Sequence, residues 1–306
     1  GVNENEPYKK KFNLKKNSFF KNSLKKISHC NFYIVCVPTP VFKNNKPNLK
    51  YLELASKNLA KVIKKNDIVV FESTVYPGVT KKCSEIIEKY SKLKKNKDFY
   101  VGYSPERVNP GDQKHTIEKI SKIVATENSY AKKNMIQVYR QVSNNIVFSK
   151  NIKEAETSKV IENIQRDLNI ALMNEIFIVC NKLKINFKEV LGLASTKWNF
   201  YKAQPGLVGG HCLPVDPYYF SHLAKKNKID TKILLAGRKV NNSMKDYVVN
   251  NIKKKIKKND KILICGVTYK ANVPDIRNSL SLKIANKLQK KYKNIDIYDP
   301  LIDKNN

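Results

Sequence analysis

The sequence predicts an α/β protein with two doubly wound domains, one on either side of a long central helix. Three patterns support this fold class. Short β-rich runs alternate with helical stretches up to about residue 150, a long segment without Gly or Pro follows, and a second alternation begins near residue 260. We expect three domains, at residues 1–150, 151–240 and 241–306, and we expect both outer domains to be incomplete.

The first domain is predicted to contain five strands. Its β-rich runs are residues 32–37, 67–72, 99–103, 122–125 and 146–148, and residues 48–64 between the first two runs carry apolar side chains at helical spacing. A mostly parallel sheet binds its ligand at the carboxyl ends of its strands. Thr39 and Thr74 follow the first two runs, so we expect a ligand beside them.

The middle of the chain is predicted to be helical. Residues 151–184 read as one helix of more than 25 residues, of the kind that bridges domains or pairs with a second subunit. A shorter helix at 187–194 and a Pro/Gly-rich stretch at 204–217 follow. The next helix tolerates Gly237, and its polar residues Arg238, Asn241 and Asn242 are expected to face water rather than a ligand. A strand at 261–267, a helix at 280–288 and a strand at 295–298 complete the prediction.

Composition excludes several classes of function. Lys+Arg number 59 against 26 Asp+Glu, a net charge of +33. The lysines are spread in short runs without any nucleic-acid-binding motif, which favours a solvated surface, and we expect no nucleic-acid partner. The apolar runs are far shorter than the roughly 20 residues of a membrane span. The polar start has no apolar signal region, so we expect a cytoplasmic protein without a membrane partner.

The six cysteines predict neither disulfides nor a metal site, because no C-x-x-C pair occurs. Cys36, Cys180 and Cys265 lie in apolar runs and are expected to be buried. Cys212 lies in the loop-like segment GGHCLPVD with Asp216 four residues on. It is either a nucleophile in a close-approach loop or an incidental thiol, and its sequence context does not decide between the two.

Other polar residues occupy positions suited to catalysis. Lys159, Asn163 and Arg166 share one face of the long helix and could bind an anion, although a solvated helix face explains the pattern at least as well. Glu106 follows a predicted strand and could act as a general base or belong to a plain turn closed by an ion pair. Thr74 could contact a cofactor or only cap a turn.

Seven segments, read together and in order, resemble the UDP-glucose/GDP-mannose dehydrogenase family. Within it they most resemble the bacterial-type UDP-N-acetylglucosamine 6-dehydrogenases that supply N-acetylhexosaminuronic acids for surface polysaccharides. The segments are VPTP (37–40), ESTVYPG (72–78), YSPERVNPGD (103–112), AETSKVIENIQRDLNIA (155–171), KWNF (197–200), PGLVGGHCLPVDPYY (205–219) and GVTYKANVPDIRNS (266–279).

The resemblance implies two Rossmann-like domains and a four-electron oxidation of a UDP-N-acetylhexosamine to the uronic acid with two NAD molecules in succession. UDP-N-acetylglucosamine is the expected substrate, with its epimers left open. Cys212 would capture the aldehyde, Lys159 with Asn163 would stabilise oxyanions, Glu106 would assist thioester hydrolysis, and Asp216 and Thr74 would place water or move protons. Substrate contacts would be Arg107, Lys159, Asn163, Arg166, Gly209 and Lys270, and cofactor contacts would be Thr39, Thr74 and Arg277.

The sequence also departs from the family. The glycine-rich turn G-x-G-x-x-G that holds the cofactor pyrophosphate does not occur among the ten glycines. Residues 1–4 resemble the family's chain after that turn, and the last domain breaks off after residue 300, so we expect a chain truncated at both ends that oxidises no substrate at a useful rate. The alternative function is a non-catalytic remnant that keeps the scaffold. A homodimer through residues 151–184 is also implied.

Overall fold

The computed structural model describes residues 23–302 of the chain. Within them, residues 23–162 and Tyr218–Lys228 form one compact unit, and Asn163–Pro217 with residues 229–302 form another. The expected division into three domains stays a prediction. Residues 1–4, which are expected to correspond to the part of the family's chain after the glycine-rich turn, lie outside the described residues. No helix within 23–302 is long and apolar enough to cross a membrane.

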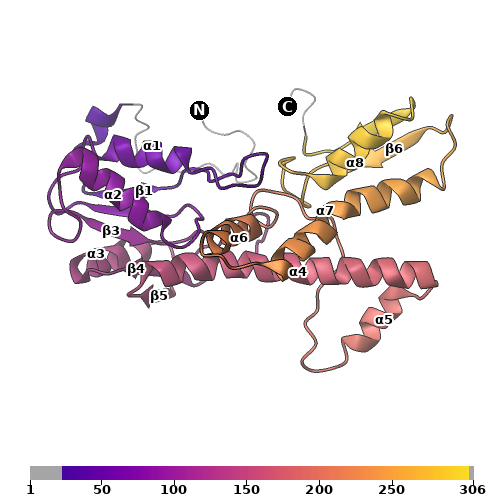
Figure 1. The fold of residues 1–306 in the computed structure, drawn as a ribbon, viewed down its shortest axis with the longest axis horizontal. Coiled ribbons are helices and arrows are strands. Elements are labelled where there is room, and N and C mark those ends of the chain that lie inside the picture. The colour runs from indigo at the N-terminus through magenta and orange to yellow at the C-terminus, as the bar shows by residue number, and fades with distance from the viewer. Residues whose placement is uncertain (1–22, 303–306) are drawn as a thin grey trace. The chain divides into compact units, whose positions relative to one another are not determined.

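The first unit is built on a five-stranded sheet with the order β1-β2-β3-β4-β5 (Figure 1). The strands are β1 (Phe32–Val35), β2 (Ile68–Phe71), β3 (Tyr100–Tyr103), β4 (Lys122–Thr126) and β5 (Ile146–Ser149). The first three are parallel, β4 runs antiparallel to β3, and β5 is parallel to β4. The five expected strands are confirmed. The ends of β1, β2 and β3 and the start of β4 therefore share one edge of the sheet.

Helices cover both faces of this sheet. The helices are α1 (Lys50–Leu59), α2 (Val79–Ser91) and α3 (Ser129–Tyr139). Figure 1 shows α1 and α2 on one face and α3 on the other, and every residue of β2 is buried, as expected for a strand covered on both faces. A Cβ on Gly102 would lie 2.3 Å from the sulfur of Met135, so this glycine lets α3 pack closely on β3.

The central helices agree with the sequence prediction except for one. The long helix α4 (Ile152–Leu183) has 32 residues, and α5 (Phe187–Ala194) follows after an Asn186 side-chain cap. Helix α6 (Asp216–Lys226) was not expected. It begins at an Asp-Pro pair, where an acidic side chain suits the helix dipole and proline suits the first turn.

The second unit contains α7 (Lys232–Lys253) and a parallel strand pair, β6 (Ile262–Cys265) and β7 (Ile295–Tyr298), linked through α8 (Leu280–Gln289). Its core joins Val249 of α7 to Ile284 and Leu288 of α8 and to Ile295 of β7. The expected strands and helices of this unit are confirmed.

The cysteine prediction is partly wrong. Cys180 is buried in α4 as expected, but Cys36 and Cys265 are exposed. Cys36 lies just beyond the end of β1, and Cys265 is on the exposed face of the two-stranded sheet. The residues next to each cysteine in sequence point to the opposite face of the strand. An apolar run alone therefore does not show that the cysteine itself is buried.

Candidate active site

Thr39 and Thr74, which follow the first two strands, are joined in the first unit. The Thr39 hydroxyl donates a hydrogen bond to the Thr74 carbonyl oxygen at 2.7 Å. The hydroxyl of Tyr219, on α6, lies 2.7 Å from the Thr39 carbonyl oxygen and 3.1 Å from that of Pro40. The two turns therefore form one surface at the carboxyl edge of the sheet, where a ligand site is expected.

Glu156 of α4 anchors the turn after β2 and is fully buried. Its carboxylate accepts the backbone N–H groups of Gly78 at 2.6 Å and Thr80 at 2.8 Å, at the N-terminus of α2. Burial raises the pKa of Glu156, although these N–H donors act to lower it. Sequence reasoning missed this residue, because its partners lie more than 70 positions away in the chain.

Glu106 and Arg107 lie in the loop after β3 and have different surroundings. The Glu106 carboxylate is exposed and accepts the Val108 backbone N–H at 2.5 Å. Arg107 forms an ion pair with Glu162 of α4 at 2.8 Å and donates to the Ser121 carbonyl oxygen at 2.8 Å. Arg107 ties the loop to α4, and the Glu106 carboxylate remains accessible.

Lys159, Asn163 and Arg166 follow one another along α4 at the expected spacing. Lys159 is 7% exposed and Asn163 is fully buried, whereas Arg166 is exposed. The interpretation as a solvated helix face is therefore wrong for the first two and right for the third. A lysine is rarely buried without an anionic partner, so Lys159 remains a strong candidate for an anion contact.

Cys212 and Asp216 form a tight turn in the second unit. The backbone N–H groups of Val215 and Asp216 both lie 3.0 Å from the Cys212 carbonyl oxygen. Asp216 is buried, and its carboxylate accepts the Asn163 side-chain amide, whose oxygen in turn accepts the Arg166 guanidinium. Four of the expected site residues are thus joined in one connected group.

The glycines before Cys212 let its loop pack against the loop that follows β6. A Cβ on Gly209 would lie 2.8 Å from the Cβ of Tyr269, and one on Gly210 would lie 2.8 Å from the Tyr269 ring. Gly210 also has a φ of 82°, which side chains disfavour. Its N–H donates to the Arg277 carbonyl oxygen at 3.0 Å.

Cys212 interacts electrostatically with the loop after β6. The hydrogen bond from Arg277 to Asp275 raises the pKa of Arg277, and the two form an ion pair at 2.6 Å. Burial, then Asp275 and Cys212, raise the pKa of Tyr269. Lys270 belongs to the same loop and is half-buried.

A buried polar network holds the start of the cysteine loop. Arg238 of α7 and Asp167 of α4 form an ion pair at 2.5 Å, and both are almost fully buried. Asn241 donates to the Asp167 carboxylate at 2.7 Å, and Asn174 donates to the Asn241 side chain at 2.8 Å. Asn174 also exchanges two hydrogen bonds, of 2.9 and 2.8 Å, with the backbone of Gly206. The expectation that Arg238 and Asn241 face water is wrong, because this side of α7 packs against α4.

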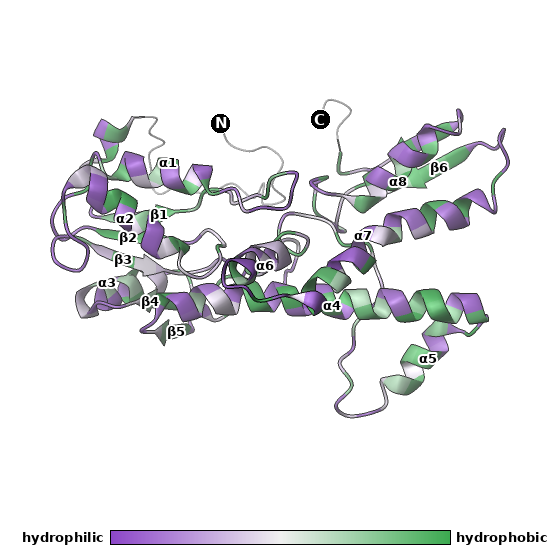
Figure 2. Cartoon of the chain, viewed as in Figure 1, coloured by the Kyte–Doolittle hydropathy of each residue, from purple (hydrophilic) through white to green (hydrophobic). Residues whose placement is uncertain are grey.

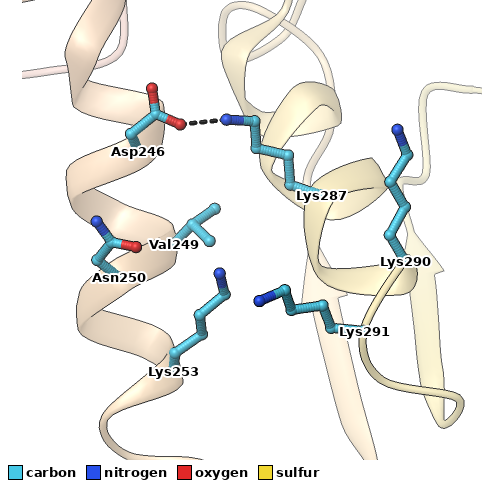
Figure 3. Close-up of a pocket in the computed structure, with 7 residues that line it drawn as sticks. All are labelled: Asp246, Val249, Asn250, Lys253, Lys287, Lys290 and Lys291. Atoms are coloured by element: carbon cyan, nitrogen blue, oxygen red, sulfur yellow. Dashed lines mark hydrogen bonds and ion pairs between the residues drawn. The ribbon is translucent and has the colours of Figure 1, made fainter.

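A separate hollow of about 470 Å³ lies between α7 and α8 (Figure 3). Its lining consists of Asp246, Val249, Asn250, Lys253, Lys287, Lys290 and Lys291. Asp246 is ion-paired with Lys287. None of the expected catalytic residues lines this hollow. Within residues 23–302, no group of three or more His, Cys, Asp or Glu side chains is placed to hold a metal.

Comparison with known proteins gives consistent matches along the chain. Models of three domains of the UDP-glucose/GDP-mannose dehydrogenase family match it: the NAD binding domain at residues 4–143, the central domain at 153–243 and the UDP binding domain at 263–306. UDP-N-acetyl-D-glucosamine 6-dehydrogenase of Salmonella typhi is 46% identical over 93% of this chain and 69% of its own length. The enzyme of the same name from Pseudomonas aeruginosa is 43% identical over 92% and 69%. The solved structure of UDP-D-ManNAc dehydrogenase from Pyrococcus horikoshii superposes with a TM-score of 0.85 at 32% identity, covering 92% of this chain and 68% of that one.

Proposed function

Because the chain belongs to the UDP-glucose/GDP-mannose dehydrogenase family, we propose that it oxidises the primary alcohol of a UDP-N-acetylhexosamine to a carboxylate. The protein is an NAD-dependent oxidoreductase of this family. The observation that carries the proposal is the connected group of Cys212, Asp216, Asn163 and Arg166. It combines a soft nucleophile with a buried carboxylate and two donors for anionic oxygens.

The turns after β1 and β2 fit the nicotinamide end of the cofactor. The Thr39 hydroxyl donates its hydrogen bond to the Thr74 carbonyl oxygen, so its own oxygen is left to accept a hydrogen bond from an amide donor. When bound, NAD supplies the hydride acceptor for each of the two oxidations. Arg277 is the third expected cofactor contact, and this role stays a prediction.

Cys212 accounts for the second oxidation. Its thiolate adds to the aldehyde carbon to form a thiohemiacetal, whose loss of a hydride and a proton leaves a thioester. Water then adds to the thioester carbonyl, the C–S bond breaks, and the thiolate and the carboxylate product are released. Overall, the alcohol loses two hydrides and gains one oxygen atom from water.

The polar residues around these steps have complementary roles in the proposal. Lys159 and Asn163 stabilise the negative oxygen of each tetrahedral species. The exposed Glu106 carboxylate accepts a proton from the attacking water, and Asp216 with Thr74 orients water or transfers protons. Substrate recognition is assigned to Arg107, Arg166, Gly209 and Lys270, and the positive side chains among them suit a diphosphate.

UDP-N-acetylglucosamine is the proposed substrate among the N-acetylated UDP-sugars, in line with the names of the Salmonella typhi and Pseudomonas aeruginosa relatives. The test is NADH formation by the protein expressed from its complete gene. It should be assayed with UDP-N-acetylglucosamine, its galactosamine and mannosamine epimers, UDP-glucose and GDP-mannose. Two NADH per sugar and a UDP-uronic acid product are expected. Preference for UDP-glucose would overturn the substrate assignment.

We also propose a homodimer formed through α4. An apolar stripe of α4, made of Leu172, Val179 and Leu183, is exposed, as is Leu193 of α5, and Figure 2 shows hydrophobic residues on both helices. A second copy would cover this stripe. Light scattering should give a dimer that Leu183→Asp dissociates and Lys182→Asp, at a neighbouring exposed position, does not. A wild-type monomer at micromolar concentration would refute the proposal.

A cytoplasmic location goes with this chemistry. Every cysteine among residues 23–302 is a free thiol. Free thiols are usual in the reducing cytoplasm, which is the location that we propose.

A further inference from the structure

A cluster of polar side chains lies at the carboxyl edge of the five-stranded sheet, outside the residues assigned above. Cys36 and Glu72 directly follow β1 and β2, Lys122 is the first residue of the antiparallel strand β4, and Tyr139 ends α3. Glu72 is the centre of the cluster. Its carboxylate lies 3.2 Å from the Lys122 ammonium, accepts the Tyr139 hydroxyl at 2.6 Å and accepts the Cys36 thiol at 3.7 Å.

Lys122 is buried in this cluster and uses all three of its donors. Its side chain is 3% exposed, and that of Glu72 is 14% exposed. Besides contacting the Glu72 carboxylate, the Lys122 ammonium donates to the carbonyl oxygens of Ser104 at 3.4 Å and Pro105 at 3.3 Å. A buried ion pair of this kind contributes little net stability compared with an apolar pair of similar volume. Stability alone therefore does not explain why the contact is there.

The two carbonyl groups that Lys122 binds belong to the residues immediately before Glu106. The Ser104 hydroxyl also donates to the Ile123 carbonyl oxygen at 2.7 Å, which fixes the same stretch to β4. On the far side of Glu106, Arg107 is held by Ser121 and by α4. The backbone is thus held in place on both sides of Glu106, at residues 104–105 and at Arg107, while the Glu106 carboxylate remains exposed.

The cluster acts by placement rather than by its charge. Although Cys36 is exposed as a residue, partial desolvation of its thiol raises the pKa of that thiol to about 12, with Glu72 the next cause. Burial, followed by the charge of Glu72, also raises the pKa of Tyr139 far above its ordinary value. Both groups remain protonated, and the Glu72 and Lys122 charges cancel. The cluster therefore adds no net charge beside the Glu106 loop.

We propose that Lys122, held by Glu72 and Tyr139, is a positioning residue that sets the Glu106 carboxylate for thioester hydrolysis. The inference rests on the proposed function and assigns Lys122 to one step of it. Misplacing a catalytic group by about 1 Å can slow its step on the order of 10²-fold. Loss of the Lys122 ammonium should therefore slow hydrolysis and leave the two oxidations before it near their wild-type rates.

The test is stopped-flow NADH formation by wild type and Lys122→Met, with UDP-N-acetylglucosamine and excess NAD. The variant should show a burst of two NADH per active site followed by a steady state slowed on the order of 10²-fold. Hydroxylamine should then restore turnover, because its nitrogen attacks the thioester carbonyl without help from Glu106. The products are the sugar hydroxamate and the free thiol. Lys119→Met, a change of an exposed lysine in the same loop, should match wild type.

Two further variants keep the inference falsifiable if Lys122→Met folds poorly. Tyr139→Phe removes one hydrogen bond to Glu72 and should give a smaller hydrolysis defect, also rescued by hydroxylamine. Lys122→Met combined with Glu106→Gln should be no slower than Glu106→Gln alone, because both changes act on one step. Unchanged hydrolysis in both Lys122→Met and Tyr139→Phe would overturn the inference, as would a loss of burst amplitude without rescue in folded protein. Absence of NADH in the wild type with every sugar would instead overturn the proposed function, and this inference with it.

Discussion

Replacing Arg238 with methionine should destabilise the second unit by about 3–5 kcal/mol, the usual cost of breaking a buried ion pair by removing one partner. Arg238 is 2% exposed and lies 2.5 Å from a fully buried Asp167. Methionine fills much of the arginine volume, so the cost comes from the carboxylate, which keeps only the Asn241 side chain as a hydrogen-bond donor. At roughly 2–4 °C per kcal/mol, the thermal midpoint should fall by about 6–20 °C.

The matched control removes both charges, as Arg238→Met with Asp167→Leu. Asn241 then keeps the Asp167 backbone carbonyl at 2.9 Å but loses its side-chain acceptor, at a cost of about 1–3 kcal/mol. The double variant should therefore be more stable than Arg238→Met alone, and circular dichroism during heating measures both. A single variant that melts within about 2 °C of wild type would refute the reasoning, since that shift corresponds to less than about 1 kcal/mol. A double variant no better than the single would refute it as well.

Three other changes test the site and the fold. Cys212→Ser should abolish turnover while calorimetry shows unchanged UDP-sugar binding, because a serine hydroxyl is a far weaker nucleophile than a cysteine thiolate; full activity would contradict the assignment. Lys159→Ala should slow an oxidation step on the order of 10²–10³-fold in single-turnover kinetics, with less effect on sugar affinity, and the reverse pattern would place Lys159 in binding. Burial acts to raise the pKa of Asp299, but three backbone N–H donors outweigh it and hold the pKa below its ordinary value. The stability from this lowered pKa is present above about pH 4 and is lost as pH falls further. Thermal midpoints of Asp299→Ala should therefore depend less on pH in that range than those of wild type, while the exposed Asp296→Ala should behave as wild type does.

Local signals in the sequence were enough to predict most of the secondary structure. The five strands of the first unit are β-rich runs, and α4 is a long stretch free of Gly and Pro, so short-range pattern and real element agree. Helix α6 was missed because it follows directly on a Pro/Gly-rich segment. The Asp216-Pro217 pair at its start is a helix signal, but the same pair closes the Pro/Gly-rich stretch at 204–217 that is predicted as a loop.

The polar interior could not be predicted in the same way. Arg238 and Asp167 are 71 positions apart, and Lys122 and Glu72 are 50 apart, so neither residue of a pair has a local sign of its partner. A basic residue on a helix face reads as solvated unless a carboxylate is known to lie opposite it. The candidate site residues are predicted from the order of seven segments, and that order indicates which residues belong together but not what holds them in place.

The buried cations of the described chain give one more argument for the proposed chemistry. In a protein with 59 basic residues, most lysines can stay in water, and burying one is expensive unless an anion accompanies it. Among residues 23–302, the buried basic side chains are Lys122, Lys159 and Arg238. Lys122 and Arg238 have Glu72 and Asp167 as counter-charges, and both contacts hold chain segments in place.

Lys159 differs, because the proposed reaction itself generates an anionic oxygen during each oxidation. A buried ammonium stabilises such an oxygen more strongly than a solvated one does, since little water competes for the charge. Burial of Lys159 therefore suits the proposed oxyanion contact, and Asn163, one turn further along α4, would offer that oxygen a second donor from the same helix face.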